Sequence, residues 1–283
     1  MRPTIHARSS LLSFKRPSYS LPICWTFPQR RHRSTEATST PEPVQPSLNP
    51  RWLSDVRLRV GTCLMHGVQP EQVKEAGEIL QEVARDWREL LLGSEGYLTG
   101  PTRRGLYRQR VVWGEEDSMG HVNNVQYNRY AESGRIEWAQ KYGKFIDPAN
   151  AKDWYGLMRP TKTGLILRKI TTDFKFPMKY PDRISVYHKL GNEPTETMEA
   201  FHFDAVIVSE LHQRPAARVV EDCVLYDYSK GKKTTLPPLM LAVLQETWRL
   251  QEEARRTNSE RVHGLLDRVR KLERESWDRG GSR

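Results

Sequence analysis

Residues that could perform acyl transfer stand together in the middle of the chain. The stretch Asp-Ser-Met-Gly-His-Val-Asn-Asn runs from Asp117 to Asn124. A carboxylate with a pKa near ~4 is ionised at neutral pH and can activate water or attack an electrophile directly. The following residues have helical spacing, and the first N–H groups of a helix can polarise a carbonyl oxygen. The same spacing also occurs in ordinary turns, where an acid only offsets the helix dipole, so both interpretations stay open.

A helix that begins at Asn123 or Asn124 is expected to hold this loop. Asparagine is a favoured N-cap residue because its side chain accepts a hydrogen bond from the first free N–H groups. Glycine costs about 1 kcal/mol relative to alanine inside a helix, so Gly134 predicts a close approach of another element. One face of the helix is expected to be buried, and it carries Tyr127, Tyr130, Ala131, Gly134 and Trp138.

Strand-like segments stand on both sides of this helix. One candidate precedes it at 106–113, and four β-branched and aromatic runs follow it, at 164–176, 183–190, 198–209 and 216–229. One strand, one long helix and four mainly antiparallel strands predict an α+β fold, in which the sheet curls around the single helix.

Helical segments are added at both ends of this block. Asn49 and Pro50 read as an N-cap and a first helical residue, and a second helix begins at Pro70. We therefore expect a helical N-terminal extension over 50–104, with a hairpin that buries its apolar stripe on the main domain. A final helix is expected from about Pro238 towards Ser276, in the C-terminal extension 239–283. Its later apolar stripe is expected to pair with a partner protein, to lie against the domain or to face solvent.

The basic excess of the chain is concentrated at its N-terminus. The 283 residues are 37% hydrophobic and 28% charged, as in soluble globular proteins, with a formal charge of +10. Residues 1–35 hold seven Arg or Lys and no acid, which leaves 38 basic and 35 acidic residues elsewhere. No nucleic-acid partner is therefore predicted. The composition of 1–35 is typical of a mitochondrial presequence and predicts a matrix location, with a disordered basic tail as the alternative. Residues 36–49 read as a flexible linker.

Several other classes of function lack their sequence signals. No apolar run approaches the ~20 residues of a membrane-spanning helix. The three cysteines are far apart and form no Cys-x-x-Cys pair, so neither a disulfide framework nor a metal site is expected. A Gly-x-Ser-x-Gly motif and a phosphate-binding glycine loop are both absent.

The segment 111–138 resembles the signature of hotdog-fold acyl-CoA thioesterases of the hydroxybenzoyl-CoA thioesterase type. An apolar strand ending in an aromatic residue is followed by Asp-x-x-Gly-His-Val-Asn-Asn, then by Tyr127, then by Glu132 and Arg135 as Glu-x-x-Arg. The resemblance covers about 105–238. It implies a hotdog fold, an antiparallel sheet wrapped around one long central helix, here with an added N-terminal helical hairpin and a C-terminal helix.

The resemblance also implies roles for the residues of the motif. Asp117 takes the place of the catalytic carboxylate, and backbone amides from Gly120 to Asn123 would polarise the thioester carbonyl. His121 is expected to fix the turn or to contact the substrate. The substrate would be an acyl-CoA, hydrolysed to a carboxylic acid and coenzyme A, with no separate cofactor. Contacts to the substrate are expected from Val122, Asn123, Asn124 and Tyr127. From their place on the turn after the strand 164–176, Lys175 and Lys179 are expected either to meet the phosphates of coenzyme A or to be solvated strand-edge charges.

Two further expectations follow from this family. Its active sites lie across a dimer interface with the sheets joined edge to edge, so a homodimer or a dimer of dimers is implied. Glu115 stands where the family usually has an aspartate. Glu132 would replace Asp117 if the latter were inert, and otherwise is expected to pair with Arg135 at i+3.

The alternative function is not catalytic. The hotdog fold also hosts non-catalytic proteins, and the helical extensions exceed what the reaction requires. In that case the chain would be a structural subunit of a mitochondrial assembly such as the ribosome.

Overall fold

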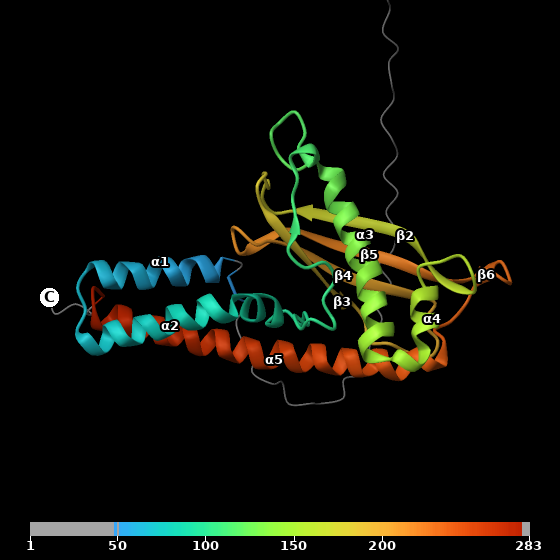
Figure 1. Ribbon diagram of the computed structural model, residues 1–283. Helices are drawn as coiled ribbons and strands as arrows, with labels where there is room; N and C mark the ends of the chain where they lie inside the picture. The colour runs from blue at the N-terminus through green and yellow to red at the C-terminus, as the bar shows by residue number, and fades with distance from the viewer. Residues whose placement is uncertain (1–47, 50, 279–283) are drawn as a thin grey trace, which may run out of the picture. The chain divides into compact units, whose positions relative to one another are not determined.

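Helix α3 (Asn124–Lys141) packs across one face of a curled antiparallel sheet (Figure 1). The computed structural model describes residues 48–49 and 51–278, so the expected presequence and nearly all of the linker lie outside the described residues. The sheet has the order β1-β3-β4-β5-β2, with β6 paired to β5. Its strands are β1 (Gln109–Arg110), β2 (Thr163–Phe174), β3 (Arg183–Leu190), β4 (Ala200–Ser209), β5 (Arg214–Asp227) and β6 (Lys232–Lys233). This arrangement confirms the expected α+β hotdog fold.

The glycine in α3 is required by the sheet beneath it. A Cβ on Gly134 would lie 2.8 Å from Val186 Cγ1 and 2.9 Å from His188 Cε1, both on β3. Such distances are shorter than van der Waals contact, so only glycine lets helix and strand approach this closely. The close approach that the sequence predicted at Gly134 is therefore confirmed.

The first strand is much shorter than predicted. Of the candidate 106–113, only Gln109 and Arg110 pair with β3. The chain then leaves the sheet and forms the short helix η2 (Trp113–Glu115). Val111 is buried in the core, whereas Val112 and Trp113 are exposed. The apolar run was mistaken for one continuous strand because the bend after it has no glycine or proline signal before Gly114.

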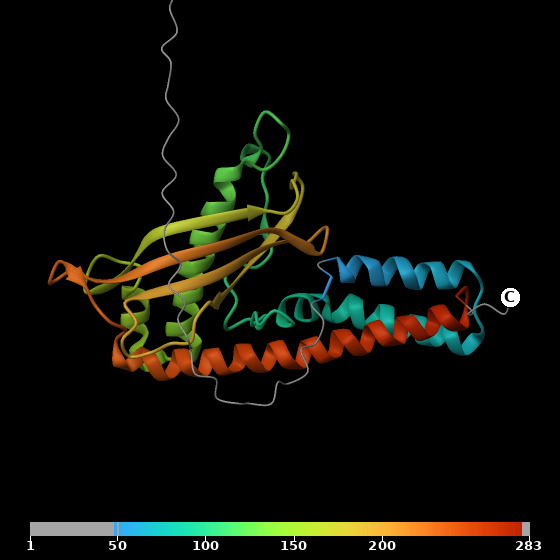
Figure 2. The same ribbon diagram turned by 180° about the vertical axis from the view of Figure 1, so that it is seen from behind.

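The helices outside the sheet form two groups. A short helix that the sequence analysis missed, α4 (Ala151–Gly156), contacts α3 and β2, and it follows the turns η3 (Tyr142–Ile146) and η4 (Pro148–Asn150). The extensions form a bundle of α1 (Trp52–Met65), α2 (Pro70–Arg88) with its continuation η1 (Glu89–Gly93), and α5 (Pro238–Glu275), visible from both sides in Figures 1 and 2.

The start of α1 corrects the predicted cap. The helix begins at Trp52 and is preceded by Arg51 at the N-cap position. Asn49 acts two residues earlier, because its Oδ1 accepts a hydrogen bond from the Arg51 N–H at 2.9 Å.

The bundle packs against part of the sheet face opposite α3, at β3 and β4. Its core includes Tyr187, Val206 and Val208 from β3 and β4 together with the apolar side of the three helices. The later stripe of α5 is buried in this core with α1 and α2. Of the three expectations for that stripe, packing within the chain is the one observed. Arg218 on β5 and Glu95 after η1 add a bidentate ion pair at 2.5 and 2.6 Å.

Candidate active site

The sequence motif forms one hydrogen-bonded loop, residues 116–123, which we call the motif loop. The Asp117 N–H donates to the His121 carbonyl at 2.9 Å, and the Gly120 N–H donates to the Asp117 carbonyl at 3.0 Å. Gly120 has a φ of +69°, a left-handed conformation that glycine adopts without steric cost. The glycine therefore allows the tight turn that sets Asp117 opposite His121.

The carboxylate of Asp117 is half-buried and is held by one of its two oxygens. Oδ1 accepts a hydrogen bond from the Met119 N–H at 2.8 Å. Oδ2 makes no hydrogen bond or ion pair with any residue that the structure describes. The turn thus fixes the direction of the carboxylate while leaving one oxygen available to a substrate or to water.

The start of α3, which follows Asp117 closely in the sequence, has backbone N–H groups without an acceptor. Asn123 is the N-cap, as predicted, and its Oδ1 accepts from the Val125 N–H at 2.9 Å. As the first helical residue, Asn124 has an N–H without an intrahelical acceptor, and within the described residues no other acceptor meets it. The helix dipole adds partial positive charge at this end. A carbonyl oxygen that gains negative charge would be stabilised here.

His121 fixes the turn through its backbone and not through its ring. Its carbonyl accepts the Asp117 N–H, whereas the imidazole has no hydrogen-bond partner in the described part of the chain. The ring is half-buried at the motif loop and remains able to contact a ligand.

The proline-containing turn after β2 is tied to the motif loop through backbone groups. The Val122 N–H donates to the Met178 carbonyl at 2.9 Å, and the Met178 N–H donates to the Tyr127 hydroxyl at 3.4 Å. The Tyr180 N–H donates to Glu116 Oε1 at 2.8 Å. Val122 and Tyr127 are both buried, so they position the loop from the core. Sequence reasoning missed Met178 because it acts through its backbone, which leaves no residue-type signal. It missed Glu116 because the carboxylate accepts from a backbone N–H 64 residues away.

The two candidate lysines of this turn differ in their surroundings. Lys175 forms an ion pair with Asp173, so its charge is already compensated. Lys179 is exposed next to the buried Met178 and has no ion pair with a described residue. Of the two, Lys179 therefore remains the free cation on the turn that contacts the motif loop.

Large apolar side chains around the motif loop are exposed in the single chain. Trp113 is 75% exposed and Met119 is 76% exposed. Val125, Phe174 and Tyr180 are exposed as well. Strand β2 lies at the edge of the sheet and pairs only with β5. Unpaired edges and apolar patches of this kind mark interaction surfaces.

The arginine of the motif pairs with a different acid from the one expected. Arg135 is buried and forms an ion pair with Glu221 of β5, and His188 Nε2 lies 3.3 Å from Glu221 Oε2. Burial alone would raise the pKa of Glu221, but hydrogen bonding and electrostatic attraction from His188 and Arg135 outweigh it and lower that pKa. Glu132 is exposed. The predicted Glu132–Arg135 pair is wrong because the arginine side chain turns into the core.

Glu115, at the position where the resembled family usually has an aspartate, closes the turn before the motif loop. Its Oε2 accepts a hydrogen bond from the Val112 N–H at 2.8 Å. Burial, and then the neighbouring Glu115 carboxylate, raise the pKa of the Tyr130 phenol far above its usual value, so Tyr130 stays neutral. Glu115 therefore has a local structural role.

Metal sites and membrane-spanning helices have no candidate among the described residues. No cluster of three or more His, Cys, Asp or Glu side chains suited to a metal ion occurs within 48–49 and 51–278. None of the helices in this part of the chain has both the length and the apolar composition needed to cross a bilayer.

Comparison with known proteins supports the family that the motif suggests. Residues 111–244 match the family model described as the thioesterase-like superfamily. No curated protein matches the chain.

Solved structures similar to the chain cover about half of it. One is a thioesterase from Thermus thermophilus complexed with coenzyme A and Zn, with 20% identity over 55% of this chain and 98% of that one and a TM-score of 0.39. Another is a DHNA-CoA thioesterase from Staphylococcus aureus, with 13% identity over 56% of this chain and 94% of that one and a TM-score of 0.39. A gentisyl-coenzyme A thioesterase shows 18% identity over 49% of this chain and 98% of that one, with a TM-score of 0.38. These values are too low to support an activity.

Proposed function

We propose that this chain, whose residues 111–244 match the model of the thioesterase-like superfamily, hydrolyses an acyl-CoA thioester to a free carboxylic acid and coenzyme A. The observation that carries the proposal is the unbonded Oδ2 of Asp117 in a loop that leads directly into the N-terminus of α3. An ionised carboxylate and an open helix start provide the two functions that thioester hydrolysis needs, a base or nucleophile and an electrophile-polarising donor.

In the proposed reaction Asp117 acts as a general base on water. Oδ2 takes a proton from the water while the water oxygen bonds to the thioester carbon. The Asn124 N–H donates to the carbonyl oxygen, which becomes negative in this step. Collapse of this intermediate breaks the C–S bond, and the departing thiolate of coenzyme A takes up a proton. As a nucleophile, the same carboxylate would form a mixed anhydride that water then hydrolyses. One such donor contributes about 10²–10³-fold to kcat.

Binding of the coenzyme is proposed to use the turn after β2. Lys179 is exposed and uncompensated, and Met178 ties its turn to the motif loop. An ammonium group there is available to the phosphates of coenzyme A. Lys175 is less suited, because Asp173 already holds it.

A homodimer is proposed to complete the site. The free edge of β2 and the exposed apolar side chains near the motif loop, Trp113 and Met119 among them, would be covered by a second copy. Light scattering after size exclusion is expected to give a mass of two chains or a multiple of two. A strictly monomeric protein that still hydrolyses acyl-CoA would contradict this arrangement.

The activity is tested by following thiol release from a panel of short, long and aromatic acyl-CoA substrates. The wild type should hydrolyse at least one of them, and Asp117→Asn should lower kcat by about 10²–10⁴-fold because the amide cannot act as a base. Glu132→Gln is the matched control on the exposed side of α3 and should leave kcat unchanged. Background rates in the wild type, or equal rates in wild type and Asp117→Asn, would contradict the proposal.

The second candidate function is a structural subunit of a larger assembly. It is favoured by two large apolar side chains of the added helix α1 that face solvent, Leu58 at 70% exposure and Met65 at 80%. Stable co-purification of other proteins, lost on changing Leu58 and Met65 to Gln, together with no thiol release, would favour this function over hydrolysis.

The mitochondrial matrix is the proposed location, on the basis of the acid-free and Arg-rich residues 1–35. These residues fused to a fluorescent protein should direct it to mitochondria. A cytosolic fusion protein would contradict the proposed location.

A further inference from the structure

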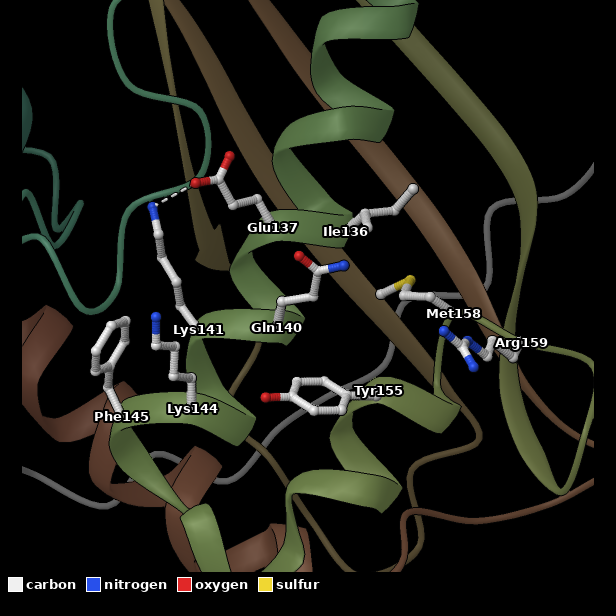
Figure 3. A pocket seen from close by; sticks show the side chains of 9 residues that line it. All are labelled: Ile136, Glu137, Gln140, Lys141, Lys144, Phe145, Tyr155, Met158 and Arg159. Atoms are coloured by element: carbon white, nitrogen blue, oxygen red, sulfur yellow. Dashed lines mark ion pairs between the residues drawn. The ribbon is translucent and has the colours of Figure 1, made fainter.

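A cavity lies between the C-terminal half of α3 and the short helix α4 (Figure 3). Its volume is about 620 Å³, within the range of pockets that hold small-molecule ligands. We call it the α3–α4 pocket. Its lining side chains come from α3, η3, α4 and the residues just before β2, and the motif loop contributes none of them.

The pocket carries two cations whose charge no neighbouring acid compensates. Its acid, Glu137, pairs with Lys141 at 2.9 Å. The Lys141 ammonium also donates to two backbone carbonyls at 3.1 and 2.9 Å, so this pair is fixed and neutral. Lys144 and Arg159 form no ion pair with any described residue. The remaining positive charge favours an anionic ligand.

Two aromatic side chains line the pocket beside these cations. Phe145 is 48% exposed and Tyr155 is 37% exposed, which leaves aromatic surface accessible from the pocket. Lys144 Nζ lies 4.9 Å from the Phe145 ring centroid. Tyr155 fits closely against Gly143, where a Cβ would lie only 2.9 Å from its Cε1. Tyr155 therefore has a defined place in the pocket wall.

Polar groups suited to a heterocycle complete the wall. Figure 3 shows the Gln140 amide and the Tyr155 hydroxyl reaching into the space between α3 and α4. Neither group has a hydrogen-bond partner among the described residues. The amide offers both a donor and an acceptor, and the hydroxyl offers the same. A flat ligand with ring nitrogens or exocyclic groups could satisfy them.

We propose that the α3–α4 pocket binds a nucleoside phosphate. Its base would stack on Tyr155 and bond to Gln140, while Lys144 on one side of these groups and Arg159 on the other would be available to its phosphate groups (Figure 3). A fatty acid fits less well, because Gln140, Lys144 and Arg159 are exposed and an alkyl chain beside them would remain in water. The nucleoside phosphate is either a free nucleotide or the nucleotide end of a coenzyme A molecule other than the one proposed to meet Lys179, and these two ligands share this chemistry.

Calorimetric titration of the full chain tests the proposal. The probes are AMP, ADP, coenzyme A, adenosine, inorganic phosphate and laurate. A nucleoside phosphate should bind with one equivalent per chain and more tightly than adenosine or phosphate alone. The double variant Lys144→Gln/Arg159→Gln should weaken it by about tenfold or more, since two charge-assisted contacts are lost. Lys152→Gln, an exposed lysine of α4 outside the pocket lining, is the control and should stay within about twofold.

The probes distinguish the two sources of the ligand. Binding of AMP or ADP identifies a free nucleotide, and binding of coenzyme A without AMP or ADP identifies the nucleotide end of the coenzyme. Both support the proposal only if the double variant weakens binding. Three results would overturn the proposal. They are no binding of any nucleoside phosphate, an unchanged affinity in the double variant, and binding of laurate or inorganic phosphate when no nucleoside phosphate binds.

Two further variants separate this site from folding defects and from hydrolysis. If the double variant unfolds, Tyr155→Leu keeps an apolar side chain but removes the ring and hydroxyl, and it should also weaken nucleotide binding. Asp117→Asn should leave nucleotide binding unchanged. Loss of nucleotide binding in the Asp117 variant would place the ligand at the motif loop and overturn the assignment to the pocket.

Discussion

The buried acid Glu221 provides the sharpest test of how the central helix is held on the sheet. Its side chain has no exposed surface, and its partner Arg135 is only 6% exposed. In Glu221→Gln the guanidinium would remain buried without a counter-charge. Breaking a buried pair in this way costs about 3–5 kcal/mol, and we expect about 3 kcal/mol because the glutamine amide oxygen can still accept one hydrogen bond.

Thermal unfolding followed by circular dichroism measures this cost. For a unit of this size 1 kcal/mol shifts Tm by about 2–4 °C, so Glu221→Gln should lower Tm by about 6–12 °C. The neighbouring Asp222→Asn is the matched control, since it breaks the pair with the half-exposed Arg168 and should cost about 1 kcal/mol or less. Equal shifts in the two variants would refute the reasoning. Changing Arg135 to Met and Glu221 to Leu together should recover part of the loss.

Three further predictions concern packing, docking and pH. Gly134→Ala should destabilise by about 1–2 kcal/mol in denaturant titration, because the clash with Val186 outweighs the gain of about 1 kcal/mol in helix propensity; a stabilised variant would contradict the close approach of α3 to β3. Arg218→Gln should speed hydrogen exchange around Glu95 while leaving the exchange of β5 little changed, because the bidentate pair docks this segment; unchanged exchange near Glu95 would argue against that role. The pKa of Glu221 is lowered from 4.5, so its stabilisation is present above that value and is lost as pH falls through the lowered pKa. Wild-type Tm should therefore fall more steeply than that of Glu221→Gln below pH 4.5, and parallel curves would count against it.

Local patterns were sufficient to predict most of the secondary structure. The run 183–190 was expected as a strand and is β3 with those bounds, because its β-branched and aromatic residues favour extended backbone. The final helix was expected from Pro238 towards Ser276, and α5 ends at Glu275. Gly134 also predicted a close contact, although the sequence could not name the strand it contacts.

Long-range partners could not be predicted from the sequence in the same way. Arg135 has a plausible acid three residues before it, but its actual partner lies 86 residues away on β5, and only the packing of helix on sheet selects that partner. The link between the motif loop and the later turn depends on backbone atoms of Met178, which any residue type would supply. Helix α4 was missed because six residues are too few for a helical period to be recognised.

The central claim is that Asp117 and the start of α3 flank one thioester. A crystal structure of the full chain with a non-hydrolysable acyl-CoA analogue, whose thioester sulfur is replaced by CH2, tests it most directly. We predict the ketone oxygen at about 3 Å from the Asn124 N, with an Asp117 carboxylate oxygen facing the ketone carbon or a water beside it. A ketone bound out of reach of Asp117, or in the α3–α4 pocket, would contradict the account.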